Sequence, residues 1–197
     1  MADIIISAYE SHSTIVDTVL LGAVLSLPHV VYRDIWQNPQ PFIKKCEKIK
    51  KEPVKVMATI GYTLKTAQYL ACLLWSYRTL SDENGNFVMS FQDLPRGVTA
   101  LAFSLILFGQ VLNFSTYKTL KQDGVYYGAK LGKNIPWVHG FPFNTFNHPQ
   151  YLGCVCSIWG ATLLVLCTVH FYRWMHVLSI GTWWTMLYLF SSIVESK

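Results

Sequence analysis

The sequence has 197 residues, a length typical of one domain, and a net charge of +5. Hydrophobic residues make up 52% of it and charged residues only 14%, whereas soluble domains have roughly 25% charged residues. This composition excludes a disordered chain, a collagen-like chain and a small disulfide-stabilised domain. It predicts a polytopic membrane protein.

Most lysines lie in two connectors between apolar runs, at residues 37–55 and 118–147. Cytoplasmic loops of membrane proteins carry such an excess of basic residues. The positive charge therefore indicates topology, and we expect no nucleic-acid partner. Both basic connectors, including the one at residues 118–147, are therefore expected to face the cytosol. With five spans, the C-terminus then lies in the cytosol as well.

Five apolar segments approach the roughly 20 residues that a helix needs to cross a bilayer. They cover residues 15–36, 56–77, 97–117, 151–171 and 174–194. The first is the weakest, because Asp17, Pro28 and His29 interrupt it. We expect an all-α, polytopic integral membrane bundle with four to five transmembrane helices, formed as a single domain by residues 1–197.

Cysteines offer no metal site in this sequence. Four of the five lie inside apolar runs, where thiols behave as small hydrophobic side chains. Cys154 and Cys156 are separated by one residue, which is the wrong spacing for a zinc site or a redox pair. We therefore expect metal-independent chemistry.

The connector at residues 118–150 has an unusual composition for a linker. From Gly124 to Gly153 the chain carries five glycines and three prolines among aromatic residues. Glycine lets a backbone approach a ligand closely, and aromatic side chains can line a pocket. The candidates for such a lining are Tyr126, Tyr127, Trp137, Phe141 and Phe143. A loop whose aromatic residues rest among lipid headgroups is an equally open interpretation of the composition.

Several motifs of this region resemble a known family. They are Leu-Asn-Phe at 112–114, Tyr-Tyr-Gly at 126–128, Gly-Lys-Asn-Ile-Pro-Trp-Val at 132–138 and Phe-Pro-Phe-Asn at 141–144. Together they make the segment similar to the phospholipid N-methyltransferase family, most closely to its plant-type branch. His-Pro-Gln-Tyr-Leu-Gly at 148–153 fits the same family and, more loosely, the isoprenylcysteine carboxyl methyltransferases.

This resemblance implies an integral membrane enzyme of the endoplasmic reticulum that uses S-adenosyl-L-methionine. The enzyme would methylate the headgroup amine of phosphatidylethanolamine derivatives, from monomethyl through dimethyl to phosphatidylcholine. Whether it also performs the first methylation is open at this point, as is the oligomeric state. The cofactor would lie among helix ends and the 118–150 loop, and the sequence has no Gly-x-Gly-x-x-Gly motif of a dinucleotide-binding sheet.

The cofactor's chemistry and the resemblance together nominate its binding residues. An acidic side chain is needed for the cofactor's ammonium group, and Glu195 is the only acid in the last two spans. The other candidates that the resemblance implies are Gly109, Gln110, Tyr127, Gly128, Pro142, Asn144, His148, Pro149 and Tyr151. For Gln110, a role in bridging two helices is equally open, because buried polar side chains also link helices.

Methyl transfer to an amine requires the amine to lose its proton, although alkylammonium groups have pKa values near about 10. His148 is the candidate base by residue type, with Tyr127 as its neighbour; shaping a turn and contacting cofactor are alternative roles for His148. Desolvation and proximity can supply the same effect. Lys133 and Lys65 are candidates for the substrate phosphate, although Lys133 also fits a simple loop charge and Lys65 a lysine that snorkels.

Two other functions are alternatives to a lipid methyltransferase. A related enzyme could methylate a prenylcysteine carboxylate, but the Gly-Lys-Asn-Ile-Pro-Trp stretch at 132–137 speaks against it. A non-catalytic membrane scaffold or a small transporter is the alternative outside the enzymes. A transporter is expected to show internal repeats, and none is found in the sequence.

Overall fold

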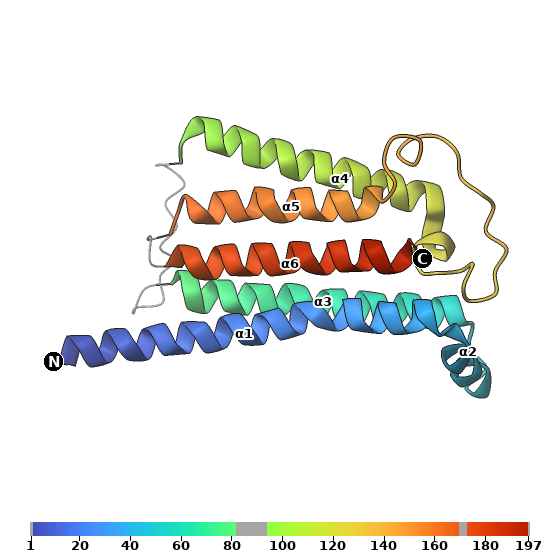
Figure 1. The fold of residues 1–197 in the computed structure, drawn as a ribbon, viewed down its shortest axis with the longest axis horizontal. Coiled ribbons are helices and arrows are strands. Elements are labelled where there is room, and N and C mark those ends of the chain that lie inside the picture. Colours follow the sequence, from blue (N-terminus) through green and yellow to red (C-terminus); the bar gives the residue numbers. More distant parts are fainter. Residues whose placement is uncertain (1, 82–93, 170–172, 197) are drawn as a thin grey trace.

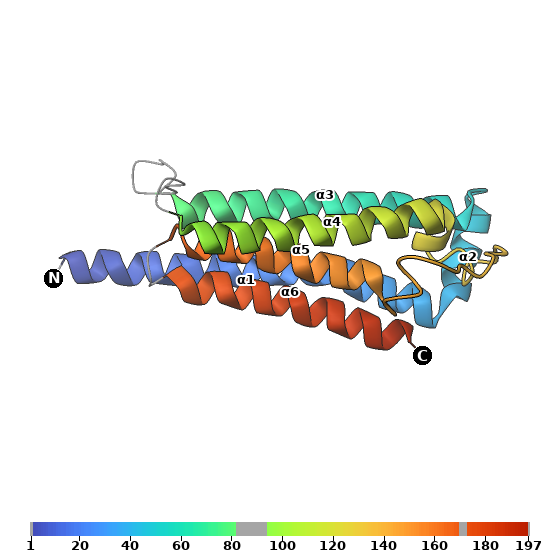
Figure 2. The same ribbon diagram turned by 90° about the horizontal axis from the view of Figure 1, so that it is seen from above.

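The computed structural model describes residues 2–81, 94–169 and 173–196. Its helices are α1 (Ala2–Gln37), α2 (Pro39–Lys48), α3 (Pro53–Leu80), α4 (Arg96–Val125), α5 (Pro149–Leu166) and α6 (Trp174–Glu195). The five long helices lie alongside one another, and the short α2 crosses one end of the bundle (Figures 1 and 2). The prediction of an all-α bundle is confirmed.

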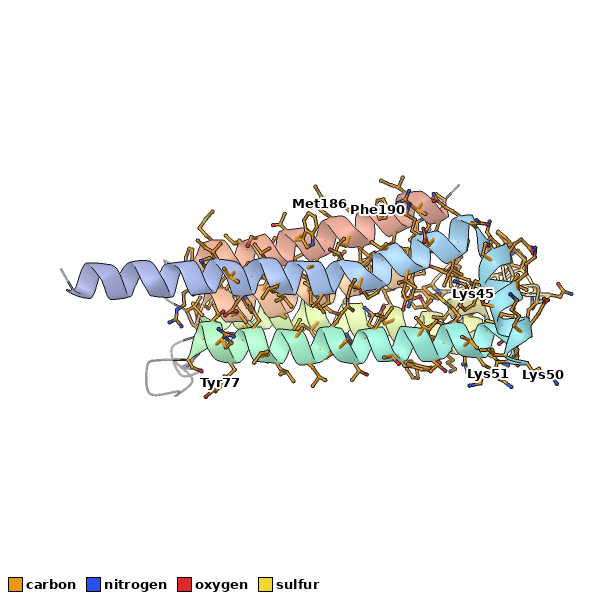
Figure 3. All side chains as sticks on the ribbon, turned by 90° about the horizontal axis from the view of Figure 1, so that it is seen from below. Lys45, Lys50, Lys51, Tyr77, Met186 and Phe190 are labelled. Atoms are coloured by element: carbon orange, nitrogen blue, oxygen red, sulfur yellow. The ribbon has the colours of Figure 1, made fainter. Side chains whose placement is uncertain are left out.

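The end of the bundle that carries α2 and the loop at residues 126–148 is called the basic end here. Helices α1, α4 and α6 run toward it, and α3 and α5 run away from it (Figure 1). Lys45, Lys50 and Lys51 project from this end (Figure 3). The last turn of α6 therefore lies beside the 126–148 loop.

Among the residues that the structure describes, four helices are long and apolar enough to cross a membrane by length and composition. They are α1 over Thr14–Gln37, α4, α5 and α6. The predicted segment at 56–77 forms α3, which is not among the four. Two polar residues lower its hydropathy: Lys65 lines a cavity inside the bundle, and the buried Gln68 donates a 2.9 Å hydrogen bond to the Leu25 carbonyl of α1.

Several boundaries differ from the sequence-based expectation, and the first helix begins at Ala2 instead of residue 15. The basic connector at 37–55 contains α2, whose Pro39 starts the helix and whose Cys46 is buried. Helix α4 continues past the expected end at residue 117 to Val125, with a kink at Lys121, where φ is 55°. Helix α5 ends at Leu166, before the expected residue 171, and residues 170–172 lie outside the described part of the chain.

Helices α4 and α5 make the most extensive contact in the bundle. A Cβ atom on Gly153 would lie 2.6 Å from the carbonyl oxygen of Gly109, and one on Gly160 would lie 2.6 Å from that of Ala102. Glycine at these positions lets the two backbones touch, as in many membrane helix pairs. The close pair fixes the start of α5, from which part of the site projects.

Candidate active site

A cavity of about 270 Å³ opens near the basic end of the bundle. Side chains of α1, α3, α4, α5, α6 and the 126–148 loop line it. Its polar or ionisable lining includes His29, Lys65, Tyr127, His148, Tyr151, Tyr188, Ser191 and Glu195. Such a concentration of polar groups inside an apolar bundle is a sign of function.

The outer end of the cavity holds its one acidic lining residue, Glu195, in the last turn of α6. The Tyr127 hydroxyl donates a hydrogen bond to its Oε1 atom. Tyr151 also lies within hydrogen-bonding reach of the carboxylate. None of the ion pairs between described residues includes Glu195. The carboxylate is thus oriented by hydroxyl groups and forms no salt bridge with a described residue.

Tyr127 is fixed by its backbone and by its neighbours. Its φ of 60° lies in the left-handed region, which is uncommon for a residue with a large side chain. The ring is buried and makes edge contacts with Trp36, at 5.1 Å between centroids, and Tyr32, at 6.0 Å. Burial raises the pKa of Tyr127 well above its usual value, and the charge of Glu195 raises it further. The hydroxyl therefore remains a proton donor at ordinary pH.

The turn after Tyr127 is closed by Gly128 and by an ionic clamp. The Gly128 amide donates a 2.7 Å hydrogen bond to the Asp123 carbonyl, and a Cβ atom at this position would collide with that oxygen. Lys133 pairs with Asp123 at 2.8 Å and with Glu52, the residue before α3. This pairing lowers the pKa of Glu52 and raises that of Lys133. The clamp ties the loop to α3 and α4.

The inner end of the cavity carries a lysine. Lys65 of α3 donates a 2.8 Å hydrogen bond to the Tyr188 hydroxyl, and its Nζ atom lies 5.4 Å from the centroid of that ring. No acidic residue of the described chain forms an ion pair with it. Tyr188 lies seven residues before Glu195 on α6, so the two ends of the cavity are about 10 Å apart along that helix.

His29 of α1 completes the inner end. Its side chain is buried, with 4% exposed, and its Nδ1 atom lies 2.7 Å from the Ser191 hydroxyl. The Nε2 atom has no hydrogen-bond partner among the residues described. Buried polar atoms are nearly always paired, by protein, water or ligand. The free nitrogen therefore marks this end of the cavity as a place for a polar group.

His148 lies at the boundary of the cavity, just before α5 begins at Pro149. Its ring stacks on Tyr151, with 5.9 Å between centroids, and its Nε2 atom lies 2.9 Å from the hydroxyl of the exposed Ser196. The imidazole thus links the cavity to the surface at the basic end. Pro149 is buried and fixes the helix start that directs both rings.

The predicted site residues fall into two groups. The cavity brings together Lys65, Tyr127, His148, Tyr151 and Glu195. The residues that do not line it are Gly109, Gln110, Gly128, Lys133, Pro142, Asn144 and Pro149.

The second group has other contacts in the structure. Gly109 packs against α5, and Gln110 donates a 3.0 Å hydrogen bond to the Ser157 hydroxyl of the same helix. Pro142 is fully buried in the loop, and the exposed Asn144 accepts a hydrogen bond from the neighbouring Thr145 hydroxyl. The contacts of Gly109 and Gln110 join α4 to α5.

Several lining residues were not predicted. They are His29, Tyr32, Trp36, Tyr188 and Ser191. The signal available for two of them was a polar side chain inside an apolar segment, since His29 and Tyr188 both lie within spans that the sequence suggested. Which face of a helix points inward is decided by packing, and this information is weak in helices that are apolar all round.

The fold and the cavity define a multi-pass membrane protein with an internal polar site. The chain belongs to the phospholipid methyltransferase family. The sequence model of this family matches residues 98–197. It is also similar, with 33% identity over 179 residues, to the phosphatidyl-N-methylethanolamine N-methyltransferase of Arabidopsis thaliana, and the match covers 90% of this chain and 92% of that protein. No solved structure matches the chain.

Family membership makes the protein a methyltransferase, as the motifs predicted. The family match begins near the start of α4, so it contains Tyr127, His148, Tyr151 and Glu195. The inner end of the cavity depends on His29 and Lys65 from the preceding half of the chain.

Proposed function

We propose that the protein transfers methyl groups from S-adenosyl-L-methionine to phosphatidyl-N-methylethanolamine and to its dimethyl product, which yields phosphatidylcholine. One observation carries the proposal: a single cavity has a carboxylate, Glu195, at its outer end and an ammonium group, Lys65, at its inner end, and neither forms an ion pair with another described residue. The Arabidopsis relative is named for the first of these acceptors.

The outer end of the cavity fits the cofactor's charge. Glu195 offers a carboxylate that no lysine or arginine of the described residues neutralises, and the C-terminal end of α6 adds a negative dipole. Tyr127 and Tyr151 orient this carboxylate toward an ammonium ligand, and their rings suit a sulfonium cation. When bound, S-adenosyl-L-methionine supplies an electrophilic methyl group.

The acceptor amine must be neutral to attack. Removal from water lowers the pKa of an amine, and the cavity surrounds its ligand with tyrosine and tryptophan rings. His148 can accept the proton released, because its imidazole lines the cavity and contacts Ser196 at the surface. We therefore assign deprotonation to burial first and to His148 second.

The acceptor's phosphate is assigned to Lys65. This side chain lines the cavity and has no acidic partner among the residues that the structure describes. The other predicted phosphate ligand, Lys133, is already paired with Asp123 and Glu52. We assign it to holding the loop.

The protein is proposed to lie in the membrane of the endoplasmic reticulum with its basic end in the cytosol. Lys45, Lys50 and Lys51 are exposed at this end (Figure 3), in agreement with the excess of basic residues in cytoplasmic loops. The cofactor, which is water-soluble, would then reach Glu195 from the cytosol.

The proposal is tested with purified protein in mixed micelles and radiolabelled S-adenosyl-L-methionine. The acceptors are phosphatidylethanolamine, its monomethyl and dimethyl derivatives, and a farnesylcysteine analogue. Label in the monomethyl or dimethyl lipid supports the proposal, and label from phosphatidylethanolamine would add the first step. Label in the prenylcysteine alone would assign the chain to a carboxyl methyltransferase. No label and no cofactor binding by calorimetry would overturn the proposal.

A matched pair of variants tests the phosphate assignment. Lys65→Met should raise the KM for lipid by about tenfold, the usual size of a charged hydrogen bond, while cofactor affinity stays unchanged. Lys44→Met, at an exposed lysine of α2, is the control and should have wild-type kinetics. Equal kinetics of the two variants would remove Lys65 from the proposed site.

A further inference from the structure

A second hollow, of about 380 Å³, lies between α5 and α6. It is called the α5–α6 groove here. His148, Tyr151 and Tyr188 line both the groove and the internal cavity. The two spaces are therefore separated by shared aromatic side chains, and the groove leads directly to the wall of the site.

The α5–α6 groove changes from polar to apolar along its length. At the basic end, where α5 begins and α6 ends, its lining includes Thr145, Asn147 and Ser192. Phe146 lies between Thr145 and Asn147 at this same end, and the apolar lining further from it consists of Leu152, Val155 and Leu189. Val155 lies six residues into α5, about 9 Å from the start of that helix. A phospholipid in the leaflet next to the basic end has the same order, with its headgroup at the end of the bundle and its chains further in.

The groove opens on an apolar outer surface. Leu152 is 36% exposed and Leu189 is 51% exposed. On the same helix α6, Met186 and Phe190 project away from the bundle (Figure 3). This surface belongs to two helices that are apolar enough to span a membrane, so lipid chains are its natural neighbours.

We propose that the α5–α6 groove binds an acyl chain of the acceptor phospholipid and that the headgroup enters the internal cavity between His148 and Tyr151. The proposal rests on the proposed function and adds the route and the chain-binding site of the lipid. The order of polar and apolar lining selects a lipid over a second copy of this chain. The wall that the groove shares with the internal cavity favours a substrate lipid over a lipid that only surrounds the protein. Only the headgroup of a substrate has to move from the groove into the cavity.

His148 forms part of the wall between the two spaces. Its imidazole plane is inclined by 14° to the Tyr151 ring, and the Ser196 hydroxyl holds its edge. Tyr188 is held from the other side by Lys65. A headgroup that passes His148 therefore brings its phosphate toward Lys65 at the inner end.

The first test fills the apolar half of the groove. Val155→Trp should raise the KM for a long-chain monomethyl acceptor by about tenfold, as overpacking of a fitted site does, and leave a short-chain acceptor unaffected. Leu107→Trp is the control, at a residue of α4 that is 67% exposed. Calorimetry with S-adenosyl-L-methionine confirms that both variants are folded. Equal kinetics of both variants with both acceptors would overturn the proposal.

The second test maps the bound chain on the wild-type protein. A monomethyl phospholipid with a diazirine in one acyl chain is photolysed in micelles, and the labelled peptides are identified with and without excess unlabelled acceptor. Label at residues 152–155 and at Leu189 that the competitor removes supports the groove. Label there that the competitor leaves unchanged identifies bulk lipid and overturns it. Competed label without any methyl transfer would retain the groove and overturn the proposed function instead.

Discussion

The hydroxyl of Tyr127 donates a hydrogen bond to the carboxylate of Glu195, and this bond joins the residues that follow α4 to the last turn of α6. The donor is held in a left-handed backbone conformation, and Gly128 closes the turn behind it. The acid is therefore oriented by a loop whose own geometry is fixed by packing and by the Lys133 clamp.

Glu195→Gln should weaken cofactor binding by about 10- to 100-fold, because a hydrogen bond to a charged group contributes roughly 1.5–3 kcal/mol. Calorimetry with S-adenosyl-L-methionine measures the change. Glu47→Gln, at an exposed acid of α2, is the matched control and should bind as the wild type does. Similar affinities for the two variants would place the cofactor's ammonium elsewhere.

Tyr127→Phe should weaken cofactor binding by about fivefold, since it removes one hydrogen bond and keeps the ring contacts with Trp36 and Tyr32. Burial and the charge of Glu195 raise the pKa of Tyr127 above its ordinary value. Its hydroxyl therefore stays protonated as the pH rises to about 10, the ordinary pKa of tyrosine. The wild-type pH profile should therefore show no alkaline loss from this group. An alkaline limb that disappears in Tyr127→Phe would contradict this assignment.

The Lys133 clamp should make the 126–148 loop sensitive to pH at both extremes. Because pairing lowers the pKa of Glu52, its contribution is complete above the ordinary value of 4.5 and is lost as the pH falls through the lowered value. Pairing raises the pKa of Lys133, so its contribution is complete below 10.5 and is lost as the pH rises through the raised value.

Limited proteolysis of the loop at several pH values measures this dependence. The wild type should be resistant between the two limits and become sensitive outside them. Lys133→Met should be cleaved faster than the wild type at neutral pH, because it removes the cation that joins Asp123 to Glu52. Lys118→Met, at an exposed lysine of α4, is the control that leaves the clamp in place. Equal cleavage of both variants would show that the clamp does not hold the loop.

Gly153→Ala should destabilise the bundle by about 1–3 kcal/mol, the usual range for overpacking, because the added methyl group meets the α4 backbone. Thermal unfolding in detergent micelles measures the effect. Gly97→Ala is the control, since a Cβ atom there has no neighbour within 4 Å and alanine favours a helix. A normal melting temperature for Gly153→Ala would show that α4 and α5 separate easily.

Much of the fold could be predicted because long apolar segments are recognisable in the sequence by their length and composition. The connector at 37–55 was harder to interpret, because its many lysines indicated a loop and it forms the amphipathic helix α2. Phe42 and Ile43 of this helix pack against the hydrophobic cluster that contains Tyr127, and Lys44 and Lys45 are exposed. Helix α4 also runs through charged residues near the basic end. Charge alone therefore marked the end of the membrane segments but did not mark the ends of the helices.

The residue types of the site could be predicted from the sequence, but the contacts between them could not. Glu195 and Tyr127 were nominated separately, and their bond follows from tertiary packing over 68 residues. For Gln110 the sequence left cofactor binding and helix bridging open, and the side chain bonds Ser157 of α5 and does not line the cavity. His29 was counted as an interruption of its helix, whereas packing brings it to the inner end of the cavity.

Trp36 gives the cavity its own fluorophore. Its ring lies 5.1 Å from that of Tyr127, and the Lys130 ammonium lies 4.5 Å above its centroid. Indole emission responds to nearby charge and to water, so a cation arriving beside Glu195 or a shift of the loop that carries Lys130 changes the spectrum. The difference between the wild type and Trp36→Phe isolates this signal from the other tryptophans. Ligand arrival thereby becomes observable in real time, in the native bilayer and without turnover.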